Sequence, residues 1–456
     1  MSDWRRGTIG ELANGYRGVT YSAGQLREFK AHDTVTLLRS NNISGGQLNV
    51  KDVQIVSKRI VSDHQFLTPG DIAVCMSNGS KALVGKSAQL LTASDERFTV
   101  GAFCSVFRPQ ASVNSRFLAY VFQSISFRSN LDLALAGTAI NNLRNAQVEA
   151  FACEIPPYEE QSKIAQILDT LDTAIRETEA LIDKLKAIKQ GLLHDLLTRG
   201  VDANGQLRPP QSEAPQLYKE SPLGWVPKEW TVAGLASAVQ KDRSVIRTGP
   251  FGSSLKGEHW RESGRPVVTI GSLGDGAFIE SELLFIDEKT AKQLVDFELC
   301  TGDIAFSRVA DVGRSVVITE EQRGWIMSSN FMRISVDSAK ARPRLLQLLL
   351  ASSILVRKQI RMTVNSAGRD VANSAVLMAL RFPWPMPEEQ DQIIERVESF
   401  ERKIAMEEAQ HQKLLAAKEG LMDDLLSGRV RVNSLLEAAQ QAAAPIVHQS
   451  VGQPGA

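Results

Sequence analysis

"PPYEEQSKIAQILDTLDTAI", residues 156–175, recurs at residues 385–404 as "PMPEEQDQIIERVESFERKI". The same offset, without a gap, aligns "KQGLLHDLLTRGV" at residues 189–201 with "KEGLMDDLLSGRV" at residues 418–430. In both copies prolines precede two glutamates and a glutamine. Proline suits the first helical turn, where its missing N–H costs nothing, and acidic side chains are favourable at the positive end of the helix dipole. The repeated segment therefore predicts two helix starts.

Apolar residues follow each start at alternating spacings of four and three, which is the heptad pattern of a coiled-coil seam. The two seams are Ile164, Leu168, Leu171, Ile175, Ile182, Leu185, Leu192 and Leu196, and Ile393, Val397, Phe400, Ile404, Leu414, Leu421 and Leu425. Gly200 and Gly428 mark the expected helix ends. We predict two helices, each roughly 60 Å long, over residues 156–199 and 385–428. They should pack as an antiparallel coiled coil, because a lone helix of this kind is unstable in water.

Polar residues interrupt both seams: Thr178, Lys189, Glu407, His411 and Lys418. We expect His411 to be a partly buried seam residue, because no second histidine, cysteine or acidic set stands at metal-ligand spacing. Gly191 and Gly420 occupy equivalent positions inside the helices, each at a cost of about 1 kcal/mol relative to alanine. Either another backbone approaches closely there or the helices kink.

The blocks around the helices repeat more loosely. "LTPGDIAVCM" at residues 67–76 resembles "LCTGDIAFSR" at residues 299–308. Short β-rich runs punctuated by glycine and aspartate, with helical stretches at residues 116–128 and 343–361, predict the same kind of domain twice. The predicted fold class is α+β, pseudo-twofold symmetric. Its parts are globular domains at 1–155 and 225–384, long spacer helices at 156–199 and 385–428, a proline-rich extended linker at 200–224, and a disordered tail at 429–456.

Charge is distributed unevenly although the chain is neutral overall. Residues 1–155 hold 16 Lys and Arg against 12 Asp and Glu, and residues 230–384 hold 20 against 16. The helical segments 156–198 and 385–428 are acidic, with 5 against 8 and 5 against 11. Basic domains suit a nucleic-acid partner and acidic helices suit protein partners, although an excess this small also arises by chance.

Several other classes of protein are disfavoured. No run has the roughly 18 uninterrupted apolar residues of a membrane span. The opening residues lack the apolar core of a secretion signal. The cysteines are scattered without metal-binding spacing, which favours reduced thiols in a cytoplasmic protein. They are Cys75, Cys104, Cys153 and Cys300.

Two motifs that look catalytic fail on detail. "GSKALVGKS", residues 79–87, has five residues between its glycines where a phosphate-binding loop needs four, so we expect a loop between two strands. "IPPY", residues 155–158, has Ile155 where an adenine methyltransferase carries Asn, Asp or Ser to hold the flipped base. No Ser/His/Asp set, carboxylate pair or metal cluster can be argued. The sequence therefore predicts a protein that is not an enzyme.

Taken together, these features resemble the specificity subunit of type I restriction–modification systems: two basic domains with a "GDI" turn, each followed by "EEQ" opening a long helix that closes on "LLTRG" or "LLSG". "GWVPKEW", residues 224–230, adds to a likeness that covers residues 1 to about 432. The resemblance implies two target-recognition domains, each reading one half of a split double-stranded DNA target, and a helix pair that sets the spacing.

The resemblance also implies partners. Two methyltransferase subunits would dock on the helices, and nuclease and translocase subunits would join that core. S-adenosylmethionine, ATP and magnesium are expected on those partner subunits, and no cofactor or metal on this chain. No membrane association is expected.

Base-reading residues are harder to predict, because the domain interiors differ between the copies. We choose polar and basic residues in predicted loops, since arginine and asparagine suit paired bonds with guanine and adenine edges. The candidates are Arg39, Asn41, Asn42, Asn78, Lys81, Lys86, Asn141, Asn142 and Arg144 in the first domain, and Ser253, Lys256, Arg308, Arg314, Arg369 and Asn373 in the second. The alternative for each is an ordinary solvated loop residue.

Two rival functions stay open at this point. The first is a methyltransferase in its own right, which the missing cofactor loop disfavours. The second is a coiled-coil scaffold or adaptor whose two heads bind carbohydrate or protein and have no role with DNA. The basic domains argue mildly against it.

Overall fold

The computed structural model describes residues 4–136, 141–238, 243–274, 276–309, 312–366, 371–435 and 437. The chain divides into two compact units, which we call unit 1 (Met1–Glu179 with Ala409–Ala456) and unit 2 (Ala180–Glu408). Each unit combines a globular domain with one part of each long helix. Most of the tail predicted to be disordered, residues 436 and 438–456, lies outside the described residues.

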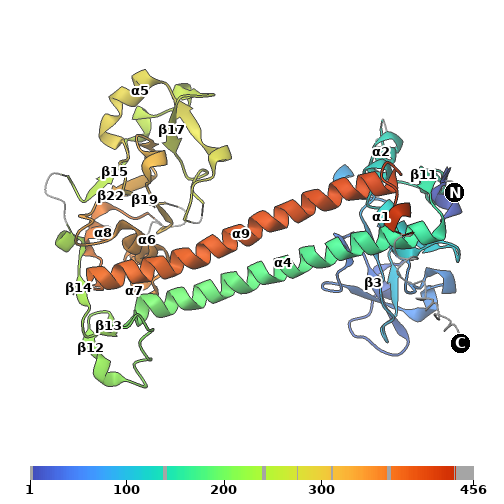
Figure 1. Ribbon diagram of the computed structural model, residues 1–456, viewed down its shortest axis with the longest axis horizontal. Coiled ribbons are helices and arrows are strands. Elements are labelled where there is room, and N and C mark those ends of the chain that lie inside the picture. Colours follow the sequence, from blue (N-terminus) through green and yellow to red (C-terminus); the bar gives the residue numbers. More distant parts are fainter. Residues whose placement is uncertain are drawn as a thin grey trace, which may run out of the picture. The chain divides into compact units, whose positions relative to one another are not determined.

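The two predicted long helices are present. Helix α4 (Tyr158–Thr198) has 41 residues and helix α9 (Pro387–Leu426) has 40, and both are drawn as unbroken ribbons in Figure 1. Inside each unit the two helix segments run antiparallel, because their ion pairs occur in opposite order along the two helices. Gly200 and Gly428 follow the helix ends with φ of 63° and 73°, as the sequence predicts.

Three of the five polar residues that interrupt the seams have partners on the other helix. In unit 1, Lys418 Nζ lies 2.5 Å from Asp172 Oδ1. His411 is partly buried, as predicted, and its Nε2 lies 3.0 Å from Glu179 Oε1. In unit 2, Lys189 Nζ lies 2.8 Å from Glu401 Oε1. The seam is therefore part apolar and part ionic.

One seam prediction is wrong, and no part of the described chain makes the close approach that is one of the two alternatives for the helix glycines. No atom of the described chain comes within 4 Å of a Cβ built on Gly191 or Gly420, so no other part of this chain approaches those glycines closely. Leu421 is exposed, and Met422 is buried in its place. Near its end α9 packs on the domain core of unit 1, together with Leu425 and Leu426, so its buried face no longer follows the heptad pattern.

The second glutamate and the glutamine of the "EEQ" motif are buried against the domain in both units. In unit 1, Gln161 Oε1 accepts a hydrogen bond from Asn114 N (2.9 Å). Glu160 accepts from Trp4 Nε1 (3.0 Å) and pairs with Arg431 (2.9 Å). The motif thus joins the start of α4 to the residue before the first strand, to the domain and to the segment after α9.

Unit 2 repeats these bonds with its own residues. Gln390 Oε1 accepts from Arg342 N (2.9 Å). Glu389 accepts from Trp230 Nε1 (3.0 Å) and pairs with Arg208 (2.5 Å). Glu160 and Glu389 therefore have a second role besides their favourable place at the helix start: each binds a tryptophan and an arginine. The helix-start pattern alone does not predict these contacts.

The domain of unit 1 contains three sheets. The largest has the strand order β2 (Ala13–Arg17), β10 (Cys104–Pro109), β7 (Ile72–Cys75), β8 (Ser87–Gln89), β5 (Gly46–Leu48) and β4 (Ile43–Ser44). The second has the order β6 (Gln54–Ser57), β3 (Thr34–Leu38) and β9 (Phe98–Val100), and β1 (Arg5–Thr8) pairs with β11 (Ala152–Ile155). The helices are α1 (Ser115–Val121), α2 (Ile125–Ala134) and α3 (Asn145–Glu149).

Unit 2 has the corresponding sheets. One has the order β15 (Ile246–Thr248), β22 (Phe331–Ile334), β19 (Ile304–Ser307) and β20 (Ser315–Val317). Another has the order β16 (Trp260–Arg261), β18 (Leu284–Ile286), β17 (Arg265–Val268) and β21 (Ile326–Met327). The short pairs are β14 (Thr231–Ala233) with β23 (Phe382–Trp384), and β12 (Tyr218–Ser221) with β13 (Gly224–Pro227). The helices are α5 (Glu288–Gln293), α6 (Pro343–Ser352), α7 (Ile354–Ser366) and α8 (Ser374–Ala379).

Two local predictions need correction. Each helical stretch expected before a long helix is two helices, and the break falls at Ser124 in unit 1, whose hydroxyl caps α2, and at Ser353 in unit 2. The linker is not simply extended, because its end folds into the β12–β13 hairpin. Ser221 Oγ and a positive φ at Gly224 shape that turn.

The "GDI" turns have a structural explanation. Asp71 and Asp303 are buried, and each accepts a 2.7 Å hydrogen bond from the backbone N–H three residues earlier. Arg108 also donates to Asp71 (3.0 Å), and Ser335 donates to Asp303 (2.6 Å). These aspartates hold the turn before the central strand of each domain. Among the residues that the structure describes, none of the helices is both long and apolar enough to span a membrane.

Candidate nucleic-acid interface

Three loops that carry predicted DNA-contacting residues meet on one surface of unit 1. They are residues 39–42 after β3, residues 77–79 after β7 and residues 141–142 before α3. Asn78 Nδ2 donates to Ser40 Oγ (3.4 Å), and Asn78 N donates to Asn141 O (3.3 Å). Asn141 Nδ2 in turn donates to the carbonyl of Gly79 (3.2 Å). We call these three loops the unit-1 rim.

Asp52 stands beside the first of these loops and organises it. Its carboxylate accepts hydrogen bonds from Asn41 Nδ2 (2.9 Å) and Arg39 Nη2 (3.2 Å). Arg39 and Asn41 keep part of their surface open to solvent. The buried amide of Asn42 accepts from Arg39 N (2.8 Å) and donates to the carbonyls of residues 49 and 51 (2.9 Å each). Asn42 therefore shapes the loop, which does not fit the predicted contact with a base.

The other candidates of unit 1 take different places. Asn142 and Arg144 are exposed, and Ser77 forms a β-bridge with Asn142. Lys81 is exposed and lies 3.6 Å from Asp132 Oδ1. Lys86 is half-buried and lines a cavity of about 620 Å³ between the domain and the helices of unit 1. In the described part of the chain no hydrogen bond joins the side chains of these two lysines to the unit-1 rim.

Unit 2 brings several of its candidates together at the equivalent place. Arg308 follows β19, and its Nε donates to Ala372 O (3.3 Å). Asn373 caps α8, with its Oδ1 accepting from Val376 N (2.9 Å). Arg314 Nη2 lies 3.4 Å from the Ile270 carbonyl in the turn after β17. We call residues 269–272, 308, 330 and 371–373 the unit-2 rim.

The remaining candidates of unit 2 are less well placed. Lys256 is exposed, and its backbone N donates to His259 Nδ1 (2.9 Å). Ser253 lies in a 3₁₀ turn, residues Gly252–Ser254. Arg369 lies outside the described residues.

The backbone frame of the two rims is the same. In unit 1 the N–H of Met76 donates to Phe103 O (2.8 Å), and in unit 2 the N–H of Arg308 donates to Asn330 O (3.0 Å). The carbonyls of Met76 and Arg308 then accept from the segments before α3 and α8, at 2.8 Å in both cases. Arg39 N bonds the side chain three residues later (2.8 Å), and so does Thr269 N (3.0 Å).

The side chains on this shared frame differ. Arg39 corresponds to Thr269, Asn41 to Gly271, Phe103 to Asn330 and Arg144 to Asn373. The frame of hydrogen bonds repeats between the units, whereas the groups that face solvent do not. Two copies of one scaffold therefore present two different surfaces.

Two features of the rims escape prediction from sequence. Phe103 is 70% exposed beside the unit-1 rim, although an isolated phenylalanine between two strands suggests core. Arg128 on α2 and Arg357 on α7 occupy equivalent positions, and each donates to the carbonyl before the glycine of the "VGKS" or "VGRS" loop, Val84 (3.0 Å) or Val312 (2.8 Å). The repeated spacing of these arginines was the available signal.

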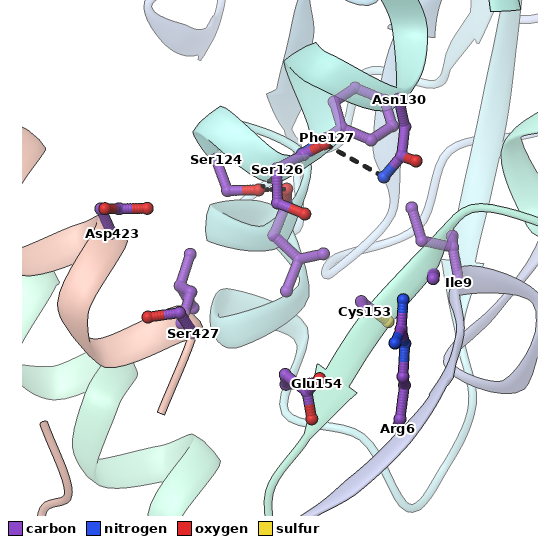
Figure 2. A pocket seen from close by; sticks show the side chains of 13 residues that line it. Arg6, Ile9, Ser124, Ser126, Phe127, Asn130, Cys153, Glu154, Asp423 and Ser427 are labelled. Carbon is purple, nitrogen blue, oxygen red and sulfur yellow. Dashed lines mark hydrogen bonds between the residues drawn. The ribbon is translucent and has the colours of Figure 1, made fainter. Parts of the chain in front are cut away.

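A cavity of about 320 Å³ lies elsewhere in unit 1, between β1, β11, α2 and the end of α9. Figure 2 shows the side chains of Arg6, Cys153 and Glu154 at its strand side and Asp423 at its helix side. Burial, and then the negative charges of Glu11 and Glu154, raise the pKa of Cys153 to about 12. The thiol therefore stays protonated at neutral pH, which does not suit a nucleophile. Across the described ranges no group of His, Cys, Asp and Glu could hold a metal ion.

Comparison with known proteins supplies the family. The profile of the family described as "Type I restriction modification DNA specificity domain" matches residues 1–187 and 246–416. The EcoKI specificity subunit of Escherichia coli K12 is 26% identical over 438 residues, which cover 94% of this chain and 88% of that protein. The StySPI specificity subunit of Salmonella potsdam is 27% identical over 444 residues, covering 95% and 87%.

Solved structures share the fold. A chain from work on complex assembly and conformational transition of the type I R-M system superposes with a TM-score of 0.57 at 14% identity, covering 94% of this chain and 98% of that one. The S subunit of a type I system from M. genitalium gives 0.51 at 16% identity, covering 93% and 96%. At these identities the likeness concerns the fold alone.

Proposed function

Because this chain belongs to the family of type I restriction–modification DNA specificity proteins, we propose that it is the subunit that selects the DNA target of such a complex. Each unit reads one half of a two-part duplex target through its rim. The chain itself carries out no catalysis and binds no cofactor.

The observation that supports this proposal most is the difference between the rims. Two domains with one backbone frame carry different solvent-facing groups, such as Arg39 and Asn41 against Thr269 and Gly271. A scaffold needs a fixed frame, and two readers of different half-sites need different donors and acceptors. Two identical surfaces would instead suit a palindromic target or a repeated ligand.

The helix pair is proposed to set the distance between the half-sites. Half-site spacing is a geometric property when two readers are joined by stiff elements. The outer faces of α4 and α9 carry an excess of acidic groups, which repel phosphates and favour protein partners. We assign docking of two methyltransferase subunits to these helices, with S-adenosylmethionine bound there and ATP and magnesium on nuclease and translocase subunits.

The test is a methylation map. The chain is co-expressed with the methyltransferase gene beside it in its genome, and N6-methyladenine is located across the host chromosome. We expect a single two-part motif with constant spacing. Exchange of residues 230–384 for the same domain of another family member should change one half only. A chain that yields no motif, or an exchange that alters both halves, would contradict the proposal.

Binding of the purified chain to DNA separates this function from that of a protein-binding scaffold. Phosphate contacts make affinity fall steeply as salt rises. An affinity for duplex DNA that ignores salt would favour the scaffold, and binding of S-adenosylmethionine by the chain alone would favour an enzyme.

A further inference from the structure

Asp52 has an unusual backbone for an ordinary loop residue. In the described part of the chain it is the only non-glycine residue with a positive φ, at 51°. This left-handed region disfavours most side chains, and aspartate and asparagine tolerate it better than others. Such conformations persist only where the surrounding structure imposes them, and they concentrate at functional sites.

This backbone aims Asp52 at two residues of the unit-1 rim. The carboxylate accepts from Arg39 Nη2 (3.2 Å) and Asn41 Nδ2 (2.9 Å), and the Asp52 carbonyl also accepts from Arg39 Nη2 (3.2 Å). The Asp52 side chain is 81% exposed, and surface pairs of this kind contribute little to stability. The contact therefore needs an explanation other than stability.

Orientation of the Arg39 side chain explains the contact with Asp52. A free arginine side chain loses much conformational freedom when it binds, and a guanidinium held in advance loses less. Both bonds to Asp52 come from Nη2 of Arg39, so they leave the two hydrogens of Nη1 unused. Arginine donors such as those of Nη1 suit the acceptors of guanine in the major groove.

The charge of Asp52 points the same way. A carboxylate on a surface that approaches phosphates weakens binding to all DNA sequences alike. The carboxylate improves DNA recognition only where it holds a base-reading donor in place or accepts a hydrogen bond from the amino group of cytosine. An acid at this position therefore lowers the affinity for all DNA sequences and increases the discrimination between base pairs.

Unit 2 has no such arrangement. Thr269 and Gly271 occupy the positions of Arg39 and Asn41, so the equivalent loop has no guanidinium to orient. Any effect of Asp52 should then appear in one half of the target only.

We infer that Asp52 is a specificity-determining positioning residue, which holds Arg39 and Asn41 for a base pair in the half-site read by unit 1. The inference rests on the proposed function and deepens it. It assigns the recognised group as a guanine–cytosine pair, because Nη1 of Arg39 offers donors that suit guanine and Asp52 offers an acceptor that suits the amino group of cytosine.

Two substitutions separate the carboxylate from the backbone. Asp52→Gly removes the side chain and accepts a positive φ without strain, whereas Asp52→Asn keeps the shape and an acceptor oxygen but removes the charge. Asp95→Asn, in the exposed loop before β9, removes one charge from the same unit and serves as the control. Each full-length variant is mapped by methylation in cells and measured for binding to the mapped duplex, to single-base variants of it and to an unrelated duplex.

We expect Asp52→Gly to make one position of one half-site degenerate, with discrimination there reduced about tenfold. Its affinity for the unrelated duplex should rise by about threefold, because a negative charge near phosphates is gone. Asp52→Asn should show the same rise but keep most of the discrimination. The half-site read by unit 2 should be unchanged in both.

The contrary results are distinct. If Asp52→Gly reads the same motif with the same discrimination as Asp95→Asn, the inference is wrong. If Asp52→Gly loses both half-sites together, Asp52 supports the fold and the inference is also wrong. A wild-type chain that yields no two-part motif would remove the proposed function itself, before any variant is compared.

Discussion

Glu160 and Glu389 are acidic residues whose charge the fold buries at the start of each long helix. Each accepts from a tryptophan Nε1 at 3.0 Å and pairs with an arginine from the segment after the other helix. A buried carboxylate is tolerated when its partners satisfy it, and removal of one member leaves the other uncompensated. These residues should therefore matter more for stability than any exposed pair on the same helices.

We predict that Glu389→Ala destabilises unit 2 by about 3 to 5 kcal/mol, because Arg208 would remain buried without its partner. Urea unfolding of the full chain measures the change. Glu388→Ala, which alters the exposed neighbour, should change the free energy of unfolding by less than about 0.5 kcal/mol. Equal effects of the two substitutions would show that the buried pair is not stabilising.

Glycines at the helix ends and inside the helices should respond in opposite directions. A Cβ on Gly200 would lie 2.0 Å from Glu389 Oε1, and its φ is 63°, so Gly200→Ala should cost at least about 1 kcal/mol. Gly191 meets open space inside α4, so Gly191→Ala should stabilise the chain by about 0.5 to 1 kcal/mol. Thermal unfolding of both variants checks the two signs, and a destabilised Gly191→Ala would mean that the helix needs a glycine there.

At the scale of elements, each unit contains the same charged triad between helices. Lys418 and Arg116 approach Asp172 in unit 1, at 2.5 Å and 3.8 Å. Lys189 and Arg344 approach Glu401 in unit 2, at 2.8 Å and 2.5 Å. A lysine of one long helix and an arginine of the domain thus share one acid on the other helix. The triads fix how each domain meets its helix pair.

The triad in unit 2 makes stability depend on pH. Burial alone would raise the pKa of Glu401, but the hydrogen bond from Lys189 and the charges of Lys189 and Arg344 outweigh it, so the pKa lies below the usual glutamate value. A depressed pKa contributes stability that is present above the unfolded value of about 4.3 and is lost as pH falls through the folded value.

We therefore predict that Glu401→Gln is less stable than the wild type at pH 7, and that the difference shrinks between about pH 5 and pH 3. Urea unfolding at several pH values measures it. Glu398→Gln is the control, because its carboxylate lies 3.7 Å from Arg402 of the same helix, and it should show little pH-dependent difference. A difference that grows at low pH would contradict the assignment.

The heptad pattern predicts both long helices, because a 3.6-residue period with apolar spacing of three and four is a local property of the chain. The pattern does not predict that Lys189 and Lys418 each form an ion pair with an acid on the other helix. Each of these pairs also includes an arginine of the domain. The pattern also does not predict that Leu421 is exposed. That end of α9 packs on a domain whose surface is composed of residues far away in the sequence.

In the molecule as a whole, the N-terminal and C-terminal segments of the chain both belong to unit 1. The residue before β1, the start of α4 and the segment after α9 meet at Glu160, because Trp4 and Arg431 both bond it. In unit 2 the linker supplies the same contact through Arg208. The linker in unit 2 and the chain ends in unit 1 are therefore equivalent places in a cyclic repeat.

This equivalence predicts that the chain tolerates circular permutation. We would join residue 435 to residue 4 by a short glycine–serine linker and open the chain between residues 211 and 212. The permutant should unfold with a free energy within about 1 kcal/mol of the wild type, because no buried contact is lost. The methylation motif should be unchanged. New ends placed inside β7 provide the control, which should not fold, and failure of the linker permutant would show that the two places are not equivalent.

The architecture can be predicted from the amino-acid sequence: two helices, two related α+β domains and a family resemblance that the comparisons confirm. These features rest on periodicity, helix-start chemistry and repetition, which local residue patterns record. The surface that we propose to contact DNA depends on the tertiary structure. Loops 39–42, 77–79 and 141–142 meet because separate strands end side by side, and Asp52 reaches Arg39 and Asn41 through a left-handed backbone that no nearby residue type requires. Contacts of that kind join residues distant in sequence, so no pattern along the chain could have predicted them.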